Sequence, residues 1–419
     1  MTSFREEITD AETEPGEPSS GASSADVAVI ALESSHRDPR RFSLDHDLGM
    51  SVLALGAEND STYCYCNGRD VELSDRLGRL TTPDAYRRLV DAVRAAMRAP
   101  NGPVDLIAHD LHPQYMTTQL ARSLGAPCIA VQHHHAHLAS VMADRGISTP
   151  VVGVCCDGVG YGADGAAWGC EIMRCTRERY ERVGRLDYFP LIGGDRAALE
   201  NWRPAAALLH AAFGDDWLKR RTASFERVDD ATIQLTDAVL RRRAAGAGPV
   251  NAPDCSSLGR VFDGVSFLLG LCERNDRPAA AAIALEAAAG DAPVDPYAYG
   301  VNMDGGAIRM SLAPTIRAIV RDLQCGNAVG TIAGRFHETL ASMLVTAART
   351  ACERFDLTTV VISGGCFANR RLREGVVSRL ENLQLRALLP RRVSVSDAGL
   401  SLGQAVIAAA RYREADPCA

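Results

Sequence analysis

Lysine is nearly absent from this sequence of 419 residues. Of its 45 basic side chains, only Lys219 is a lysine, and it lies in a polar, arginine-rich stretch. A P-loop needs a lysine directly after its glycines to reach the phosphates, so this nucleotide-binding motif is excluded. Schiff-base chemistry is disfavoured as well, because a reactive lysine is usually desolvated in an apolar pocket and Lys219 lies in a polar stretch.

Paired-cysteine motifs and long apolar runs are missing as well. None of the 13 cysteines forms a CxxC pair, so a zinc ribbon is disfavoured and we expect most thiols to be small buried residues. No run approaches the roughly 18 apolar residues of a membrane span. The N-terminus is acidic and polar, unlike a secretion signal. We expect a cytoplasmic protein without a membrane segment.

The net charge of −7 gives no electrostatic basis for nucleic-acid binding, and none is expected. A hydrophobic share of 47% is typical of a globular protein. The length exceeds that of one ordinary core and predicts two domains or lobes.

The most distinctive segment is VQHHHAH at 131–137, which holds four of the ten histidines. His133 and His137 are four residues apart and share one face of a helix. Two imidazoles at this spacing can bind a divalent metal. The glutamate of the HExxH protease motif is absent, so a protease is disfavoured. The alternative is a histidine-rich helix whose imidazoles are only buried. His134 and His135 point elsewhere and need not be ligands.

The N-terminal half predicts a tail followed by an α/β unit. Residues 1–25 are polar and acidic and predict disorder; a short strand at 26–32 and an irregular stretch at 33–49 follow. The unit then has strands at 51–55, 61–66 and 71–73, a helix at 82–97, a strand at 104–108, a helix at 115–124, and a strand at 128–131 before the histidine helix. Asn67-Gly68 predicts a hairpin turn.

A second unit begins at residue 151. A buried strand at 151–156 enters a glycine-rich turn at 157–165, and 166–173 returns as its hairpin partner. Helices are expected over 196–290 and 312–355, with a break at Gly326-Asn327. A strand at 359–362, a helix from 370, a strand at 384–388 and a final helix at 402–413 complete the unit.

Strand, glycine turn and strand thus occur twice. Such turns expose backbone N–H groups that can bind phosphate. With the later strand–Gly-Gly–helix, this layout predicts the two-lobed α/β fold of actin, Hsp70 and sugar kinases (ASKHA). We expect a first lobe at 50–150 and a second at 151–419, with a helical insertion at about 196–355 and a C-terminal helix that returns to the cleft.

In this layout residues 56–60 form the first phosphate loop, 157–165 the second, and Gly364-Gly365 the adenosine loop. Asp397 lies at the base of the final helix, where it can face the cleft and the histidine helix. Two histidines and one aspartate with open positions are typical of catalytic Fe(II) or Zn sites. The alternative for Asp397 is a helix N-cap.

Several motifs resemble the C-terminal transferase domain of HypF, the carbamoyltransferase of nickel–iron hydrogenase maturation. The resemblance covers roughly 50–410. The motifs are VQHHHAH at 131–137, DGVGYGADG at 157–165, GGD at 193–195 with ENWR at 200–203, SSLGRVFD at 256–263, RFH at 335–337 and SGGCFANR at 363–370.

The resemblance implies that carbamoyl passes from carbamoyl-adenylate to the C-terminal cysteine of a HypE-like protein and later becomes the cyanide ligand of the hydrogenase iron. It implies a metal at His133, His137 and Asp397. It also implies phosphate contacts at Asp157, Gly158 and Gly160, ribose binding at Asp263, and nucleoside binding at Asn369 beside Gly364 and Gly365.

The sequence departs from the HypF pattern in three respects. The acylphosphatase-like, zinc-finger and YrdC-like modules have no counterpart, so we expect a stand-alone transferase domain that receives its adenylate from a separate YrdC-like protein. The usual Glu-Leu-Lys-Asn reads ENDS at 58–61, which places Asp60 where a lysine is usual. The usual Tyr-Glu-Gly-Gln reads NDRP at 275–278, with Arg277-Pro278 in its second half.

Two other functions remain open. One is transfer to a small-molecule hydroxyl, which the missing modules favour. The other is a degenerate nucleotide- and metal-binding scaffold, which the Asp60 and Arg277-Pro278 changes favour.

Four further features are weaker. HDLH at 109–112 is interpreted as cleft lining or structure, against a second metal or proton relay. Cys366 is interpreted as a buried thiol, against a nucleophile. Trp168 and Trp202 are expected in the core or an acceptor channel.

Overall fold

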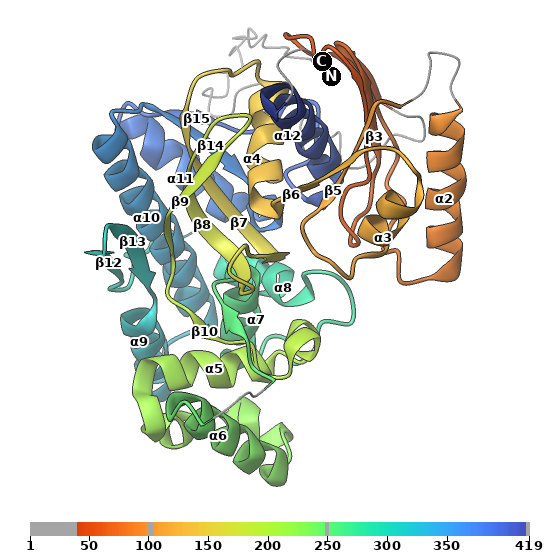
Figure 1. The fold of residues 1–419 in the computed structure, drawn as a ribbon. Helices are drawn as coiled ribbons and strands as arrows, with labels where there is room; N and C mark the ends of the chain where they lie inside the picture. The colour runs from red at the N-terminus through yellow and green to blue at the C-terminus, as the bar shows by residue number, and fades with distance from the viewer. Residues whose placement is uncertain (1–39, 99–103, 248–250, 291, 416–419) are drawn as a thin grey trace, which may run out of the picture.

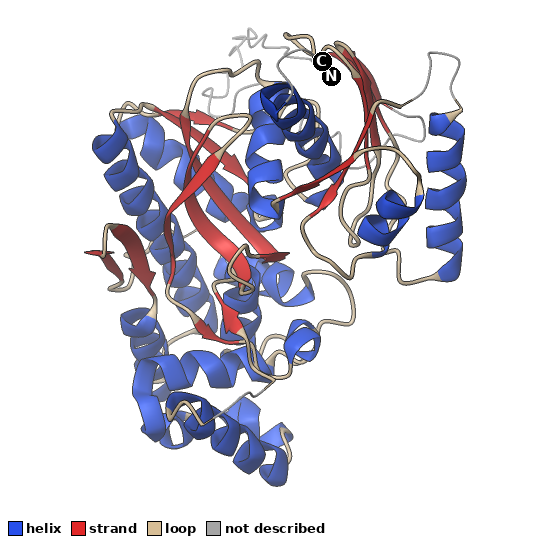
Figure 2. Ribbon diagram, in the orientation of Figure 1, coloured by secondary structure: helices blue, strands red, loops and turns tan. Residues whose placement is uncertain are grey.

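The computed structural model describes residues 40–98, 104–247, 251–290 and 292–415. Two β-sheets stand apart with helices between and around them (Figures 1 and 2). The expected disordered tail and the strand at 26–32 lie outside the described residues. No helix in these ranges is both long and apolar enough to cross a membrane.

The first sheet has six strands in the order β1-β4-β3-β2-β5-β6. Strands β2, β5 and β6 are parallel to one another. Strand β3 pairs antiparallel with β2 and with β4, and β4 pairs antiparallel with β1. The predicted turn at Asn67-Gly68 joins β3 to β4. The strands are β1 (Arg40–Ser43), β2 (Ser51–Ala54), β3 (Cys64–Asn67), β4 (Asp70–Leu73), β5 (Leu106–Asp110) and β6 (Cys128–Val131).

The second sheet has nine strands, with the main order β12-β13-β9-β8-β7-β14-β15. β7 pairs antiparallel with β8, as predicted, and parallel with β14. The strands are β7 (Val151–Tyr161), β8 (Ala167–Cys175), β9 (Tyr180–Leu186), β10 (Phe189–Pro190), β11 (Asp254–Cys255), β12 (Gly300–Asp304), β13 (Ala307–Ser311), β14 (Thr359–Ser363) and β15 (Arg386–Leu388).

The α-helices cover the outer faces of both sheets and fill the space between them (Figure 1). They are α2 (Pro83–Met97), α3 (Met116–Ser123), α4 (His133–Asp144), α5 (Trp202–Phe213), α6 (Asp230–Ala244), α7 (Leu258–Leu268), α8 (Ala280–Ala289), α9 (Ala313–Gln324), α10 (Val329–Phe355), α11 (Arg370–Asn382) and α12 (Leu400–Ala415). Short 3-10 helices are η1 (Gly194–Ala198), η2 (Gly214–Arg220), η3 (Ala223–Arg227), η4 (Gly365–Ala368) and η5 (Asp397–Gly399).

Helices α4 and α12 lie side by side between the two sheets (Figure 1). On α12, Leu402 and Val406 pack with Val52 of the first sheet. On α4, Leu138 and Met142 pack against the second sheet. The two helices therefore join the lobes through a continuous apolar interior. Helix α12 shares the core of the first sheet, whereas the sequence-based division placed it with residues 151–419.

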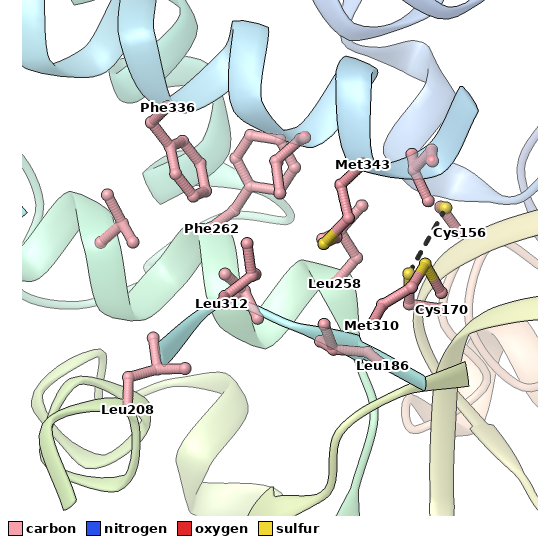
Figure 3. Close-up of a cluster of buried hydrophobic side chains, with 14 of the residues drawn as sticks. Cys156, Cys170, Leu186, Leu208, Leu258, Phe262, Met310, Leu312, Phe336 and Met343 are labelled. Carbon is pink, nitrogen blue, oxygen red and sulfur yellow. Dashed lines mark hydrogen bonds between the residues drawn. The ribbon is translucent and has the colours of Figure 1, made fainter. Parts of the chain in front are cut away.

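The largest core lies on the other face of the second sheet, under α5, α7 and α10. Side chains alternate along β7, so Val152, Val154 and Cys156 face this core while Cys155 faces α4. Figure 3 shows the centre, where Phe262 of α7 meets Phe336 of α10 edge to face, with ring centroids 5.5 Å apart. This packing forms part of the core that also buries Val152, Val154 and Cys156 of β7.

Three strand features differ from the sequence-based expectation. The stretch at 33–49, expected to be irregular, contains β1, which pairs with β4. The region at 196–355, expected to be a helical insertion, also contains β11 and the hairpin of β12 and β13. β9 was not predicted. β1 and β12 are edge strands and β11 has two residues, whereas β9 lies inside the second sheet between β13 and β8. Pairing with neighbouring strands, more than their own residues, makes these segments strands. The break at Gly326-Asn327 is confirmed, between α9 and α10.

The close approach of α4 and α12 depends on Gly403. A Cβ atom there would lie 1.8 Å from the Ala136 carbonyl oxygen. We expect Gly403→Ala to lower the free energy of unfolding by about 1–3 kcal/mol, because the overlap outweighs the gain in helix propensity. Urea unfolding tests this, with Glu414→Ala on the exposed end of α12 as a control that should change stability little. Unchanged stability of Gly403→Ala would contradict the close packing.

Candidate metal centre

Helix α4 starts directly after β6, so its first turn lies at the carboxyl end of that strand. Gln132 caps the helix, and its side-chain oxygen accepts a hydrogen bond from the His135 N–H at 2.9 Å. All residues of α4 are buried. The rings of His133 and His137 lie one turn apart with centroids 5.0 Å apart. The predicted helical pair is therefore present in the interior between the two sheets.

Two carboxylates from other elements meet this histidine pair. Asp397 Oδ1 lies 3.5 Å from His133 Nε2 and 3.3 Å from His137 Nε2. Asp157 Oδ2, from β7, lies 3.4 Å from His133 Nε2. One ligand atom from each of the four residues lies within 4.8 Å of the others. Ser396, not Asp397, caps the following turn, so the N-cap alternative for Asp397 is wrong.

The four residues fit a single divalent ion. Within the described chain, the Nε2 atoms of His133 and His137 are buried without a hydrogen-bond partner. Donor atoms bound about 2.1 Å from one tetrahedral ion lie about 3.4 Å apart, close to the separations found here. Two imidazole nitrogens and two carboxylates suit Zn or Fe(II).

The charges of the cluster also favour a cation. Burial lowers the pKa of His133, but Asp110, Asp157 and Asp397 surround the ring and raise this pKa well above its usual value. Burial raises the pKa of Asp157, but His133 and His137 hold it below its usual range. Burial and the charge of Asp157 raise the pKa of Asp397, but His133 and His137 bring this pKa below its usual value. Asp157 is buried and Asp397 is partly buried. Ionised carboxylates in such surroundings need a positive partner, and a metal ion would supply one.

Asp110 orients the first histidine. The Nδ1–H of His133 donates to Asp110 Oδ2 at 2.8 Å, which leaves the Nε2 lone pair directed at the cluster. The other Asp110 oxygen accepts from the His112 N–H at 2.9 Å. Sequence reasoning interpreted the segment at 109–112 as cleft lining or structure. The available signal was the parallel pairing of β5 with β6, which places Asp110 opposite Val131, two residues before His133.

The remaining histidines of this region lie outside the cluster. His135 Nε2 donates to the Thr176 carbonyl at 2.8 Å, and burial lowers the pKa of His135 to about 4. Burial also lowers the pKa of His134 well below its usual value. His109 Nδ1 donates to the Asp110 carbonyl at 2.7 Å. The statement that His134 and His135 need not be ligands agrees with this geometry.

The glycines after Asp157 have two different surroundings. The pairing of β7 with β8 shifts register between Cys156 and Gly160, where the glycine-rich segment begins. A Cβ on Gly160 would lie 2.5 Å from His134 Cε1, so this glycine lets β7 contact α4. Gly158 has open space on its Cβ side. Gly165 has open space as well. The phosphate contacts expected at Gly158 and Gly160 stay a prediction.

The Gly364-Gly365 turn is tied to the cluster. The Gly365 N–H donates to Asp157 Oδ1 at 3.0 Å, and the Gly364 N–H donates to the Val395 carbonyl at 3.0 Å. The predicted adenosine loop and the metal candidates thus share one hydrogen-bond network.

Asn369 is held on both sides of its amide. Its oxygen accepts from the Leu372 N–H at 2.9 Å, and its nitrogen donates to His337 Nε2 at 3.0 Å. Its role toward a nucleoside stays a prediction.

Asp263 lies on α7, outside the four-residue cluster. It forms an ion pair with Arg260 at 2.7 Å and accepts from Asn275 Nδ2 at 2.9 Å. Burial raises its pKa. The Asn275 oxygen accepts from the Ala281 N–H at 2.9 Å. The NDRP segment at 275–278, which differs from the HypF pattern, therefore contacts Asp263 and the start of α8 through Asn275. Ribose binding by Asp263 stays a prediction.

The surroundings of Cys366, Trp168 and Trp202 favour structural roles for these residues. Burial raises the pKa of the Cys366 thiol well above its usual value, which argues against a thiolate nucleophile. The guanidinium of Arg182 lies 3.8 Å from the ring centroid of Trp168, which is buried. Trp202 is partly buried against the main core.

Comparisons with known proteins identify the family of this chain. The chain matches the family described as "Carbamoyltransferase, Kae1-like Domain, second subdomain" over residues 153–404, and the "HypF Kae1-like domain" over residues 47–144. It belongs to the HypF carbamoyltransferase family. The matched regions contain His133, His137 and Asp157 as well as Asp397.

Individual relatives cover most of this chain. A carbamoyltransferase HypF homolog of Cupriavidus necator is 40% identical over 368 residues, covering 85% of this chain and 91% of that protein. The carbamoyltransferase HypF of Rhizobium leguminosarum bv. viciae is 34% identical and covers 85% of this chain but 45% of its own length. The chain spans about half the length of several other curated HypF proteins.

A solved structure shares the fold. Full-length HypF "in the phosphate- and nucleotide-bound form" superposes with a TM-score of 0.83 at 30% identity, covering 89% of this chain and 57% of that one. The predicted two-lobed ASKHA-type α/β fold is confirmed.

Asp110 supplies a test of the centre. We expect Asp110→Asn to weaken Zn²⁺ or Fe²⁺ binding by about 10- to 100-fold, because His133 loses the carboxylate that orients it. Competition with a chromogenic chelator measures the affinity. Asp237→Asn is the matched control. Asp237 lies on α6, away from the cluster, and its buried carboxylate accepts a hydrogen bond from Trp217 Nε1. Equal metal affinity in Asp110→Asn and in the wild-type protein would contradict the assigned role.

Proposed function

We propose that the chain is a metal-dependent carbamoyltransferase that uses carbamoyl-adenylate and transfers carbamoyl to the C-terminal cysteine of a HypE-like protein. The observation that carries the proposal is the largely buried cluster of two histidines and two carboxylates in a member of the HypF family. The thiocarboxamide product would serve cyanide-ligand synthesis in nickel–iron hydrogenase maturation.

The proposed transfer is a substitution at the carbamoyl carbon. The cysteine sulfur forms a bond to this carbon, the bond from the carbon to the phosphate oxygen breaks, and AMP leaves with the electron pair. The thiol proton passes to solvent. A divalent ion held by His133, His137, Asp157 and Asp397 would polarise the carbamoyl carbonyl and neutralise the phosphoryl charge.

The chain's own groups would orient this reaction. Asp110 keeps the lone pair of His133 directed at the cluster. The Gly365 N–H fixes Asp157, and the open backbone at Gly158 can approach a phosphate. Fixed donors of this kind stabilise charge that develops on a leaving phosphate.

Nucleotide use rests on the family likeness and on the loops. The solved HypF with 30% identity carries a nucleotide, and the glycine-rich turn and the Gly364-Gly365 turn lie beside the metal candidates. In this proposal a separate YrdC-like protein supplies the adenylate, and the reaction takes place in the cytoplasm.

Intact mass spectrometry of the acceptor tests the proposal. A HypE-like protein is incubated with this chain, carbamoyl phosphate, ATP and a YrdC-like synthase. We expect a carbamoyl mass increase on the terminal cysteine. The increase should disappear with His133→Ala and persist with His135→Asn, because His133 belongs to the cluster and His135 does not. No mass increase, when full-length HypF works in parallel, would contradict the proposed acceptor reaction. Transfer only to a small-molecule hydroxyl would show that the acceptor is a small molecule and not a protein cysteine.

A further inference from the structure

The turn that presents Asp397 is held mainly by the first lobe. Thr62 Oγ1 donates to the Ala398 carbonyl at 3.1 Å, and Ser140 Oγ donates to the Gly399 carbonyl at 2.7 Å. Both bonds are buried. These contacts hold the carbonyl groups of the two residues after Asp397. Ser394 and Ser396, which precede Asp397, are held by other side chains.

Those partners are Asp60 and Arg76. Asp60 Oδ2 accepts from Ser396 Oγ at 2.8 Å and lies 3.2 Å from Arg76 NH1. Arg76 NH2 donates to Ser394 Oγ at 3.2 Å, and the two serine hydroxyls lie 2.9 Å apart. The four side chains form a closed ring, which we call the aspartate clasp (Asp60, Arg76, Ser394 and Ser396).

The clasp acts on the residue directly before the metal candidate. Ser396 Oγ also accepts from the Ala398 N–H and so caps η5, in which Asp397 is the first residue. The same Ser396 oxygen therefore contacts Asp60 of the first lobe and caps the turn that begins with Asp397. Movement of Ser396 would move the Asp397 carboxylate relative to His133 and His137.

The backbone of Asp60 is suited to this contact. Its φ of +46° is uncommon for a residue other than glycine, and aspartate is among the residues that tolerate it best. Its negative charge lies beside the Arg76 guanidinium, so it is compensated rather than free at a phosphate site. The substitution that separates this chain from the HypF pattern thus has a defined partner.

We propose that Asp60 is a positioning residue, which through Ser396 holds Asp397 in place for metal binding. This inference rests on the metal centre of the proposed function. A lysine at this position would place an ammonium group next to Arg76 and would remove the acceptor for Ser396.

The test is metal binding by the full chain, with Co²⁺ as the probe. We expect Asp60→Ala to weaken Co²⁺ binding roughly tenfold, at the low end of effects from groups outside the ligand set. We also expect the visible absorption of bound Co²⁺ to change, because that band reports ligand geometry. Asp60→Asn keeps an acceptor for Ser396 and should recover much of the affinity. Asp60→Lys should bind more weakly than Asp60→Ala.

A double-mutant cycle separates the clasp from general damage. If Asp60 acts through Ser396, Asp60→Ala should have little further effect in a Ser396→Ala background. Asp84→Ala is the matched control, because Asp84 is also an aspartate paired with an arginine, Arg87, but lies on distant α2. Its Co²⁺ affinity and spectrum should equal those of the wild-type protein.

The outcomes distinguish the two proposals. Tight Co²⁺ binding by the wild-type protein with an unchanged affinity and spectrum in Asp60→Ala would overturn the clasp alone. Independent, additive effects of Asp60→Ala and Ser396→Ala would also overturn it. Absence of Co²⁺ binding in the wild-type protein would contradict the metal centre itself, and with it both proposals.

Discussion

One buried and one partly buried carboxylate lie beside two buried imidazoles between the two sheets, and the surrounding structure depends on this arrangement. Charges removed from water need close partners of opposite sign. The residues come from three elements: α4 supplies the histidines, β7 supplies Asp157, and η5, directly before α12, supplies Asp397. Gly403 lets α12 approach α4 closely enough for them to meet.

An ion at this centre would connect the lobes as well as perform chemistry. His133 and His137 follow the first sheet, whereas Asp157 belongs to the second. Binding to groups that come together only in the folded chain stabilises that chain. The hydrogen bond from the Gly365 N–H to Asp157 extends the connection to the predicted adenosine loop. The metal candidates and the Gly364-Gly365 turn are therefore connected through Asp157.

The sequence predicted the parts of this site that local periodicity specifies. The spacing of His133 and His137 and the glycine turns were readable because each depends on a few neighbouring residues. The placement of Asp110 beside His133 depends on the register of β5 with β6, and that of Asp157 beside Asp397 on how β7 meets η5. Such pairings join residues as far apart in the chain as His133 and Asp397, and no local pattern encodes them. Short edge strands such as β1 were missed for the same reason.

X-ray absorption spectroscopy of the protein loaded with one equivalent of Zn²⁺ tests the centre most directly. The account predicts a first shell of nitrogen and oxygen atoms only, with the outer-shell scattering of two imidazoles. A sulfur atom in the first shell, from any of the 13 cysteines, or a shell without imidazole would contradict it.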